Sequence, residues 1–433
     1  MENKQTIKEE YPKIMVFSHN CFSKSGSNGR TLSNLLIEWP NNSLAQFYIN
    51  NELPDSPVCN NYYRVLDTEA LEAFYKGSRV GKIINSEMEN YKVNKKDVSL
   101  NTIYNRHRNR KSFNYIIRNL IWDSNKWRGK GFKKWVDDFN PDIILLQVGD
   151  YAFMMKIALS VAKKQKIPIV LYNSEDYYFK DKKSFSLLYR LYRSQYKRQF
   201  EKLIKYSSHT VYICDMLQET YNKKFNHKSS VIMTATEVIP FKSVNNNEKY
   251  IISYLGNLSV GRHESLIELA NTLQSIDGNF KIDVYGKIPN KEVEKALLSS
   301  SGIRLKGFIS YDEVTRVMNT SNLLVHAENF SDFYKWDLKH AFSTKIADSL
   351  ASGTCFFVYA PENMASSKYL IENKAACVVT DSKNLFKSLV ELIENEEQQR
   401  QYVNNALSLV KLNHSKDINN KVFKEIIDKV GHK

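Results

Sequence analysis

Short apolar runs alternate with longer, helix-like stretches along almost the whole chain, and this alternation is what most restricts the fold. The runs span residues 13–17, 143–148, 169–172 and 210–214 in the first half, and 251–255, 280–285, 323–326 and 355–359 in the second. Nearly continuous apolar strands separated by helices indicate parallel sheets that are covered on both faces. The pattern therefore predicts an α/β fold with two Rossmann-like domains.

A polar, asparagine-rich segment at residues 242–250 has the composition of a linker between two halves that differ in charge. Residues 1–240 hold 38 Lys and Arg against 24 Asp and Glu, whereas residues 241–433 hold 24 against 23. Almost all of the net charge of +15 thus lies in the first half, as if the halves met different partners. We expect domains at residues 1–240 and 248–414, followed by a last helix at residues 415–433.

Several protein classes do not fit the composition. With 42% hydrophobic residues the chain can build sizeable cores, which argues against wholesale disorder. The five cysteines form no CxxC pair and are odd in number, so a reducing compartment is the simpler interpretation. The first residues lack the apolar core of a signal peptide. The longest apolar stretch, residues 143–162, is interrupted by Asp150 and Lys156. We therefore expect a cytoplasmic protein that is able to sit on a membrane.

The residues that follow each strand are the functional candidates, because ligands in open α/β sheets bind beyond the carboxyl ends of the strands. After the first strand, Gly26 and Gly29 enclose Ser27 and Asn28, and a helix is expected from about Arg30. Such a loop can present backbone N–H groups to an anion. The dinucleotide fingerprint GxGxxG is absent, and an ordinary turn explains the glycines equally well.

The most informative stretch begins at Ser343 in the second half. Ser343 or Thr344 can cap a helix that ends before Gly353. Lys345 and Asp348 are three residues apart and share a face of that helix. A helix N-terminus with a lysine favours a diphosphate, and the carboxylate can accept hydrogen bonds from ribose hydroxyls. Taken alone, a capped helix with a surface ion pair is the alternative.

The ordered set of these features resembles the donor-binding half of GT-B glycosyltransferases, and more narrowly retaining glycosyltransferase family 4, over residues 251–381. The set is Gly256, Arg262, Tyr285–Gly286, Gly307–Phe308, Glu328, Ser343–Asp348 and Gly353. A strand glycine followed six positions later by a basic residue matches Gly256 and Arg262. The family's (P/S)xKxxEAxAxG helix matches residues 343–353, with Ser343 and Lys345 in their expected places.

This chain also departs from the family pattern. Asn257 stands where the family usually has arginine, and Asp348 replaces the second glutamate of its ExxxxxxxE signature. The first position of that signature is His340, and an extra stretch at about residues 331–339 separates Glu328 from the helix. Either Glu328 or His340 then takes the part of the first glutamate, and we favour Glu328.

The resemblance implies a GT-B architecture, in which two Rossmann-like domains with parallel sheets face an inter-domain cleft and the final helix crosses back to the first domain. It also implies retaining transfer from a nucleotide-sugar, with UDP as the nucleotide. Arg262 and Lys345 would stabilise the leaving diphosphate, Glu328 would hold the donor sugar and Asp348 the ribose. The loop at residues 26–30 would close over the diphosphate.

Further residues complete the predicted site. Asn257 and His326 lie at strand ends of the donor half, and Asp176, after the third strand of the first half, is placed to orient an acceptor hydroxyl. Solvated turns and helix caps more often explain such an acidic residue, and the same holds for His19. The chain has no Asp-x-Asp and no HExxH, so we expect a metal-independent hexosyltransferase without cofactors, whose nucleotide-sugar is a substrate.

The basic first half permits two partner classes. Residues 104–135 carry ten Lys and Arg, one acidic residue and seven aromatic residues, and residues 184–206 show an aromatic stripe at helical spacing. This composition suits nucleic acid or an anionic membrane surface, and a plain packed core explains the stripe as well. With a transferase second half the membrane is favoured. We therefore expect a peripheral enzyme on the inner face of the plasma membrane that extends a glycan or polyprenyl-linked acceptor in surface polysaccharide biosynthesis. A nucleic-acid-binding protein without transferase activity is the alternative.

Overall fold

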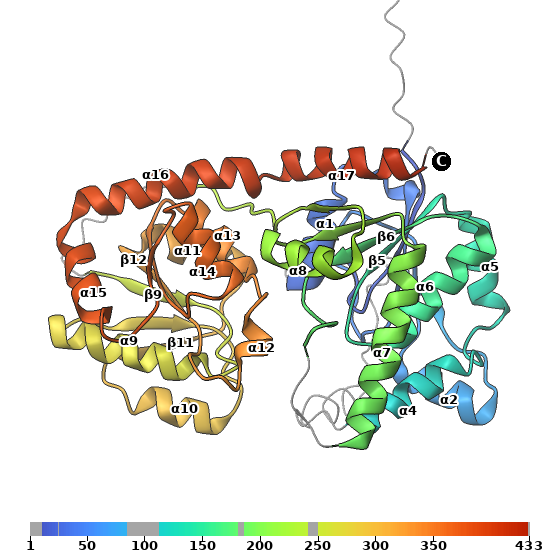
Figure 1. The fold of residues 1–433 in the computed structure, drawn as a ribbon, viewed down its shortest axis with the longest axis horizontal. Coiled ribbons are helices and arrows are strands. Elements are labelled where there is room, and N and C mark those ends of the chain that lie inside the picture. The colour runs from blue at the N-terminus through green and yellow to red at the C-terminus, as the bar shows by residue number, and fades with distance from the viewer. Residues whose placement is uncertain (1–10, 25, 85–111, 181–185, 241–249, 432–433) are drawn as a thin grey trace, which may run out of the picture. The chain divides into compact units, whose positions relative to one another are not determined.

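The computed structural model describes residues 11–431 except 25, 85–111, 181–185 and 241–249, and it contains two compact units (Figure 1). Unit 1 comprises Met1–Ile213, Gln218–Val231 and Asn420–Lys433, and unit 2 comprises Cys214–Leu217 and Ile232–Asn419. Residues 232–240, which the sequence analysis placed in the first domain, thus belong to unit 2. These residues form hydrogen bonds with the rest of unit 2. For example, the Thr236 hydroxyl donates a hydrogen bond to Asp348.

Unit 1 contains an eight-stranded sheet with the order β4-β3-β2-β1-β5-β6-β7-β8. Its strands are β1 (Ile14–Phe17), β2 (Leu44–Tyr48), β3 (Tyr62–Arg64), β4 (Lys82–Ile84), β5 (Ile143–Gln147), β6 (Ile169–Asn173), β7 (His209–Tyr212) and β8 (Ser229–Val231). All neighbours are parallel except β3 and β4. The chain runs outward from β1 to β2 and then returns to β5 on the other side of β1. The topological switch point, where ligands bind in such sheets, therefore lies between β1 and β5.

The helices of unit 1 bury most of their aromatic residues. They are α1 (Ser27–Leu35), α2 (Asp67–Lys76), α4 (Ser112–Asp123), α5 (Lys130–Phe139), α6 (Ala152–Gln165), α7 (Leu187–Tyr206) and most of α8 (Asp215–Phe225), with the 3₁₀ turn η1 (Asn41–Ser43). Trp122, Trp127 and Trp135, three of the aromatic residues of the basic segment 104–135, are buried. On α7, Tyr196 and Phe200 are buried, so most of the described part of that stripe is core.

Unit 2 contains a fully parallel six-stranded sheet with the order β11-β10-β9-β12-β13-β14. Its strands are β9 (Ile252–Leu255), β10 (Ile282–Tyr285), β11 (Ile303–Gly307), β12 (Leu323–Ala327), β13 (Cys355–Tyr359) and β14 (Cys377–Val379). Its helices are α9 (Arg262–Ile276), α10 (Lys291–Leu298), α11 (Tyr311–Thr320), α12 (Lys335–Leu338), α13 (Thr344–Ala351), α14 (Ala365–Glu372), α15 (Leu385–Glu394) and α16 (Glu396–Asn413). The switch point lies between β9 and β12. The prediction of two units with mostly parallel sheets is thus confirmed.

The last helix, α17 (Lys416–Gly431), begins in unit 2 and contributes to unit 1 from Asn420 onward. The Asn420 side chain donates to the carbonyl of Asn34 at 3.0 Å, and the rings of Phe423 and Trp39 lie 5.7 Å apart. Phe423 and Ile427 are fully buried, whereas Ile418, near the start of the helix, is 42% exposed. One continuous helix therefore belongs to both units.

Two glycines at neighbouring strand ends of unit 2 approach each other very closely. Gly256 follows β9 and Gly286 follows β10, and a Cβ added to Gly286 would lie 1.9 Å from the Gly256 carbonyl oxygen. The obstacle is backbone, which cannot move aside as a flexible side chain can. Only a residue without a Cβ fits at this edge of the sheet.

We therefore predict that Gly286→Ala destabilises the protein by about 1–3 kcal/mol, the range for overpacking. Gly278→Ala is the matched control, since a Cβ there meets nothing within 4 Å. Denaturant unfolding of both variants measures the difference. Equal stability of the two variants would contradict this explanation of the paired glycines.

Candidate active site

The start of α9 is locked to the loop that follows β12. Gly261 precedes α9 in the left-handed conformation, with φ of 74°, and a Cβ there would lie 2.5 Å from the Asn329 side-chain nitrogen. That nitrogen donates to the Gly261 carbonyl at 2.8 Å and to the Glu264 carboxylate at 2.9 Å. The two strand-end loops at the switch point of unit 2 are thereby held in one fixed arrangement.

Arg262, the first residue of α9, forms a two-pronged ion pair with Glu328, which follows β12. Its Nε donates to Glu328 Oε2 at 2.7 Å and its Nη2 to Oε1 at 2.9 Å. The two side chains are only 16% and 5% exposed. His326 Nε2 lies 3.1 Å from the same Oε1, and Arg262 Nη1 donates to the carbonyl of Asn257 at 3.3 Å. Four of the sequence-predicted residues therefore converge at one point.

The charge state of Glu328 follows from these contacts. Burial alone would raise the pKa of its carboxyl group, but the Arg262 guanidinium and His326 outweigh burial and lower the pKa to about 2. Glu328 is therefore a permanent anion at neutral pH. Since both of its oxygens accept hydrogen bonds from the protein, it holds Arg262 in place, whereas the sequence analysis expected it to hold donor-sugar hydroxyls.

The second cation of the predicted site lies at the start of α13. The Ser343 hydroxyl caps this helix by accepting the N–H of Lys345 at 3.3 Å. Lys345 Nζ lies 3.3 Å from Asp348 Oδ2, and the Thr236 hydroxyl donates to Asp348 Oδ1 at 2.9 Å. Asp348 is fully buried, whereas Ser343, Thr344 and Lys345 remain partly exposed. In this arrangement Asp348 positions Lys345 and Thr236, rather than standing open to a ribose.

The other residues that the sequence predicted for the donor site can also be located in the structure. Asn257 Oδ1 accepts hydrogen bonds from the N–H and the hydroxyl of Ser259, so this side chain shapes the turn before α9. His340, the alternative to Glu328, is buried at 4% exposure, and it is Glu328 that pairs with Arg262. Gly353 ends the α13 segment with φ of 76°, as the sequence indicated.

In unit 1, the glycine loop leads into a helix as predicted. Gly26 is the N-cap of α1, whose first residue is Ser27. A Cβ on Gly29 would lie 2.3 Å from the carbonyl oxygen of Cys21, so this turn of the helix packs tightly on the strand-end segment. Asn28 is exposed on the first turn, while Arg30 is buried. The loop can thus offer backbone N–H groups near the β1 end.

Asp176 follows β6 but is built into its own turn. Its Oδ1 accepts the N–H of Phe179 and the hydroxyl of Tyr221, both at 2.9 Å, and the residue is 7% exposed. Glu175 beside it is exposed. This environment suits a carboxylate that fixes the loop after β6.

Sequence reasoning missed a cluster at the switch point of unit 1, where Asp150 was treated only as a break in an apolar run. Tyr115 on α4 donates to Asp150 Oδ2 at 3.1 Å, and Tyr192 on α7 donates to the Asp150 carbonyl at 3.0 Å. A Cβ on Gly149 would lie 2.1 Å from the His19 ring, which in turn lies 5.2 Å from the Tyr151 ring. The signal was available, because a Gly-Asp pair directly follows the apolar run at residues 143–148.

Among the described residues, no group of three or more His, Cys, Asp or Glu side chains is arranged to hold a metal ion. Within the same residues, no helix is both long and apolar enough to cross a membrane.

Comparison with protein families gives a match to part of unit 2. Residues 235–408, which lie within unit 2, match the family described as Glycosyl transferases group 1. This segment contains Arg262, Glu328 and Lys345. No protein of curated function matches the chain in sequence.

Solved structures show the same architecture over nearly the whole chain. HepE from Anabaena, in complex with UDP and glucose, has a TM-score of 0.64 at 11% identity and covers 97% of this chain and 100% of its own. Sucrose-phosphate synthase from Thermosynechococcus elongatus has a TM-score of 0.63 at 10% identity, covering 96% and 98%. WaaG, a glycosyltransferase involved in lipopolysaccharide biosynthesis, has a TM-score of 0.59 at 12% identity, covering 95% and 99%. At these identities the similarity shows the fold, which is that of GT-B glycosyltransferases.

We predict that Glu328→Gln destabilises the protein by about 3–5 kcal/mol at neutral pH, because it leaves the largely buried Arg262 without its counter-charge. The carboxyl has a pKa of about 2 in the folded protein against an ordinary 4.5. The extra stability of the wild type over the variant is therefore complete above about pH 4.5, and it declines as the pH falls towards 2. Unfolding curves between pH 3 and 7 measure it.

Asp283→Asn, which breaks the Arg304–Asp283 pair of unit 2, is the control for losing an ion pair away from the strand ends. Glu328→Gln should destabilise the protein more than Asp283→Asn, because the Arg262–Glu328 pair is less exposed than the Arg304–Asp283 pair. A Glu328→Gln protein with wild-type stability would show that Glu328 does not hold Arg262.

Proposed function

We propose that this chain, a glycosyltransferase whose residues 235–408 match the group 1 family on a GT-B fold, transfers a hexose with retention of configuration from a UDP-sugar. The observation that carries the proposal is the Arg262–Glu328 pair at the switch point of unit 2. It fixes a guanidinium at the strand ends, where α13 also presents its N-terminus and Lys345. The printed ligands of HepE, UDP and UDP-glucose, support the choice of nucleotide.

The chemistry follows from these charges. Negative charge grows on the diphosphate as the bond to the sugar breaks, and donors fixed in advance stabilise it without reorganisation. Arg262 and Lys345 supply positive charge, and the helix starts at residues 262 and 344 add backbone N–H groups and their dipoles. In the retaining mechanism that the resemblance implies, a donor phosphate oxygen helps to take the acceptor proton. A paired general acid and base, and a resident metal, are then unnecessary.

The acceptor half is assigned to unit 1. The carboxylate of Asp150 lies at the switch point between β1 and β5 and is partly exposed beside the rings of Tyr115 and Tyr151. A carboxylate accepts hydrogen bonds from sugar hydroxyls, so Asp150 orients the acceptor. Asp176 contributes by fixing the loop after the neighbouring β6.

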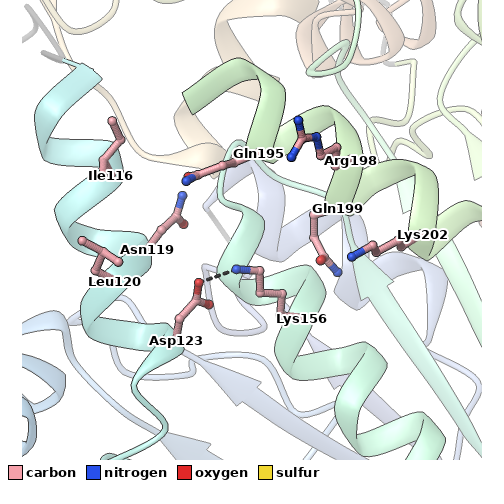
Figure 2. Close-up of a pocket in the computed structure, with 9 residues that line it drawn as sticks. All are labelled: Ile116, Asn119, Leu120, Asp123, Lys156, Gln195, Arg198, Gln199 and Lys202. Carbon is pink, nitrogen blue, oxygen red and sulfur yellow. Dashed lines mark hydrogen bonds and ion pairs between the residues drawn. The ribbon is translucent and has the colours of Figure 1, made fainter. Parts of the chain in front are cut away.

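A membrane-facing role is assigned to α4 and α7. Between them lies a cavity of about 190 Å³, lined by Ile116, Asn119, Leu120, Asp123, Lys156, Gln195, Arg198, Gln199 and Lys202 (Figure 2). Lys156 pairs with Asp123, whereas Arg198 and Lys202 have no ion-pair partner among the described residues. A phosphate headgroup matches these amide and cationic groups.

Apolar side chains extend this surface. Six on α4 and α7 are 38–78% exposed, namely Phe113, Ile117, Leu120, Leu187, Leu188 and Leu191. Exposed apolar residues beside unpaired cations are typical of helices that bind at a membrane interface. We therefore place the enzyme on the cytoplasmic face of the plasma membrane, where it extends a polyprenyl-linked or other glycan for a surface polysaccharide. The basic segment 104–111, which the sequence analysis named for the same role, lies outside the described residues.

Arg262→Ala and Lys345→Ala should each lower the kcat/KM of UDP-sugar hydrolysis by ~10²-fold or more, the effect of removing one charge-stabilising donor. Lys368→Ala, at an exposed lysine on α14, is the matched control. Steady-state release of UDP measures the effect. Near wild-type rates in both site variants would refute the diphosphate assignment.

Activity should survive EDTA, because side chains and helix N-termini of this chain meet the diphosphate charge. The measurement compares UDP release before and after dialysis against EDTA. If activity is abolished and then restored by manganese or magnesium, the metal-independent mechanism is wrong.

The protein should sediment with anionic but not with neutral vesicles, and high salt should weaken the binding. Combining Arg198→Gln with Lys202→Gln should reduce affinity ~30-fold, at ~1 kcal/mol for each cation. Lys291→Gln with Lys295→Gln removes equal charge from exposed positions of unit 2 and should have no effect. Equal binding to both vesicle types, or to neither, would overturn the membrane role. Selective binding to RNA or DNA would instead favour the nucleic-acid alternative.

A further inference from the structure

The segment between Glu328 and α13 exposes three large aromatic side chains. Phe333 is 72% exposed, Trp336 45% and Phe330 38%. The other four of the chain's five tryptophans, by contrast, are at most 4% exposed. Single exposed apolar side chains are common on protein surfaces, whereas a cluster of exposed aromatic side chains marks a binding surface. The donor-site chemistry described above makes no use of these rings.

The segment is firmly attached beside the Arg262–Glu328 pair. The N–H of Ser331 donates to Asn329 Oδ1 at 2.7 Å, and Asn329 itself is bonded to the start of α9. The ring of Phe330 packs 4.6 Å from that of Tyr359 at the end of β13. The exposed rings are therefore held on unit 2 at the strand-end edge that carries Arg262.

Trp336 lies on α12, and Phe333 lies three residues earlier in the turn that leads into this helix. The N–H groups of Tyr334, Asp337 and Lys339 donate to carbonyls three or four residues earlier. Residues at this spacing lie on the same side of a helix, so the two rings form one surface. α12 is labelled within unit 2 in Figure 1.

The charge of the segment selects the kind of ligand. The segment contains two acidic and two basic residues, so its net charge is zero, and Lys335 pairs with Asp332 at 3.7 Å. Such a neutral surface gives little electrostatic attraction for a polyanion or an anionic membrane, in contrast to the surface formed by α7 of unit 1. A neutral ligand with a flat apolar face, whose polar edges remain hydrated, fits two exposed rings on such a surface. A pyranose ring has that form.

We propose that Phe333 and Trp336 form a stacking surface for a pyranose ring of the acceptor glycan, next to the site of sugar transfer. This inference rests on the proposed function for the identity of the ligand as an acceptor.

Tryptophan fluorescence of the full chain tests the proposal directly, because Trp336 is the one tryptophan that is substantially exposed to a soluble quencher. Acrylamide quenching is measured with saturating UDP, and then with UDP plus methyl hexopyranosides and disaccharides of glucose, galactose and N-acetylglucosamine. Sorbitol at equal concentration controls for a polyol without a ring. UDP release from UDP-sugars is measured separately, so that loss of the proposed activity and loss of glycan binding are distinguished.

At least one pyranoside should reduce quenching about twofold and saturably, while sorbitol has no effect. Phe333→Ala keeps the reporter and should weaken the binding about tenfold, the upper range for one aromatic stacking contact. Phe386→Ala, which removes a 50% exposed ring on α15, should leave it unchanged. Trp336→Phe should abolish the quenching change and so identify its source.

Three outcomes would overturn the inference. In the first, no pyranoside protects Trp336 from quenching although UDP binds. In the second, UDP alone gives the full protection, which would make this a surface for the nucleobase. Protection by anionic vesicles in place of sugars would make it a membrane contact. Glycan protection without any UDP-sugar turnover would support the stacking surface and contradict the proposed transferase activity.

Discussion

The buried ion pair between Arg262 and Glu328 joins two strand ends that are adjacent in the sheet but 66 residues apart in sequence. Removing two charges from water is costly, so such a pair is weak evidence for stability and better evidence for orientation. The pair, the Asn329 amide and the left-handed Gly261 together fix where α9 begins. The proposed diphosphate site depends on this arrangement, because it determines where the guanidinium is held.

Each unit places its polar side chains where its strand order reverses. In unit 1 this point carries His19 and Asp150, and in unit 2 Arg262 and Glu328. The two sets differ in charge: the unit 2 set offers fixed cations suited to a diphosphate, while the unit 1 set offers a carboxylate among tyrosine rings. This difference is the physical basis for the proposal that unit 2 binds the donor diphosphate and that unit 1 orients the acceptor hydroxyl, on the common rule that open α/β sheets bind ligands at the switch point.

Much of this architecture was predictable from the sequence, because buried parallel strands are continuous apolar runs, and all eight predicted runs are strands. Strands β3, β4, β8 and β14 are three residues long, too short for that signal. Arg262 and Glu328 were recognised singly, but their pairing depends on strand order. The buried Asp348 accepts a hydrogen bond from Thr236, which is 112 residues away in the chain, so this contact could not be predicted either. Asp150 was overlooked because a hydropathy pattern registers a charged residue only as an interruption.

The cations at the switch point of unit 2 are proposed to bind the diphosphate of a nucleotide-sugar. Hydrolysis of a panel of UDP-, GDP-, ADP- and CMP-sugars by the full chain, with the anomer of the released sugar followed by NMR, tests this role. We expect turnover of a UDP-sugar with the α-configuration of the donor retained in the first product. Turnover of no donor, combined with tight binding of RNA or DNA, would refute the proposal.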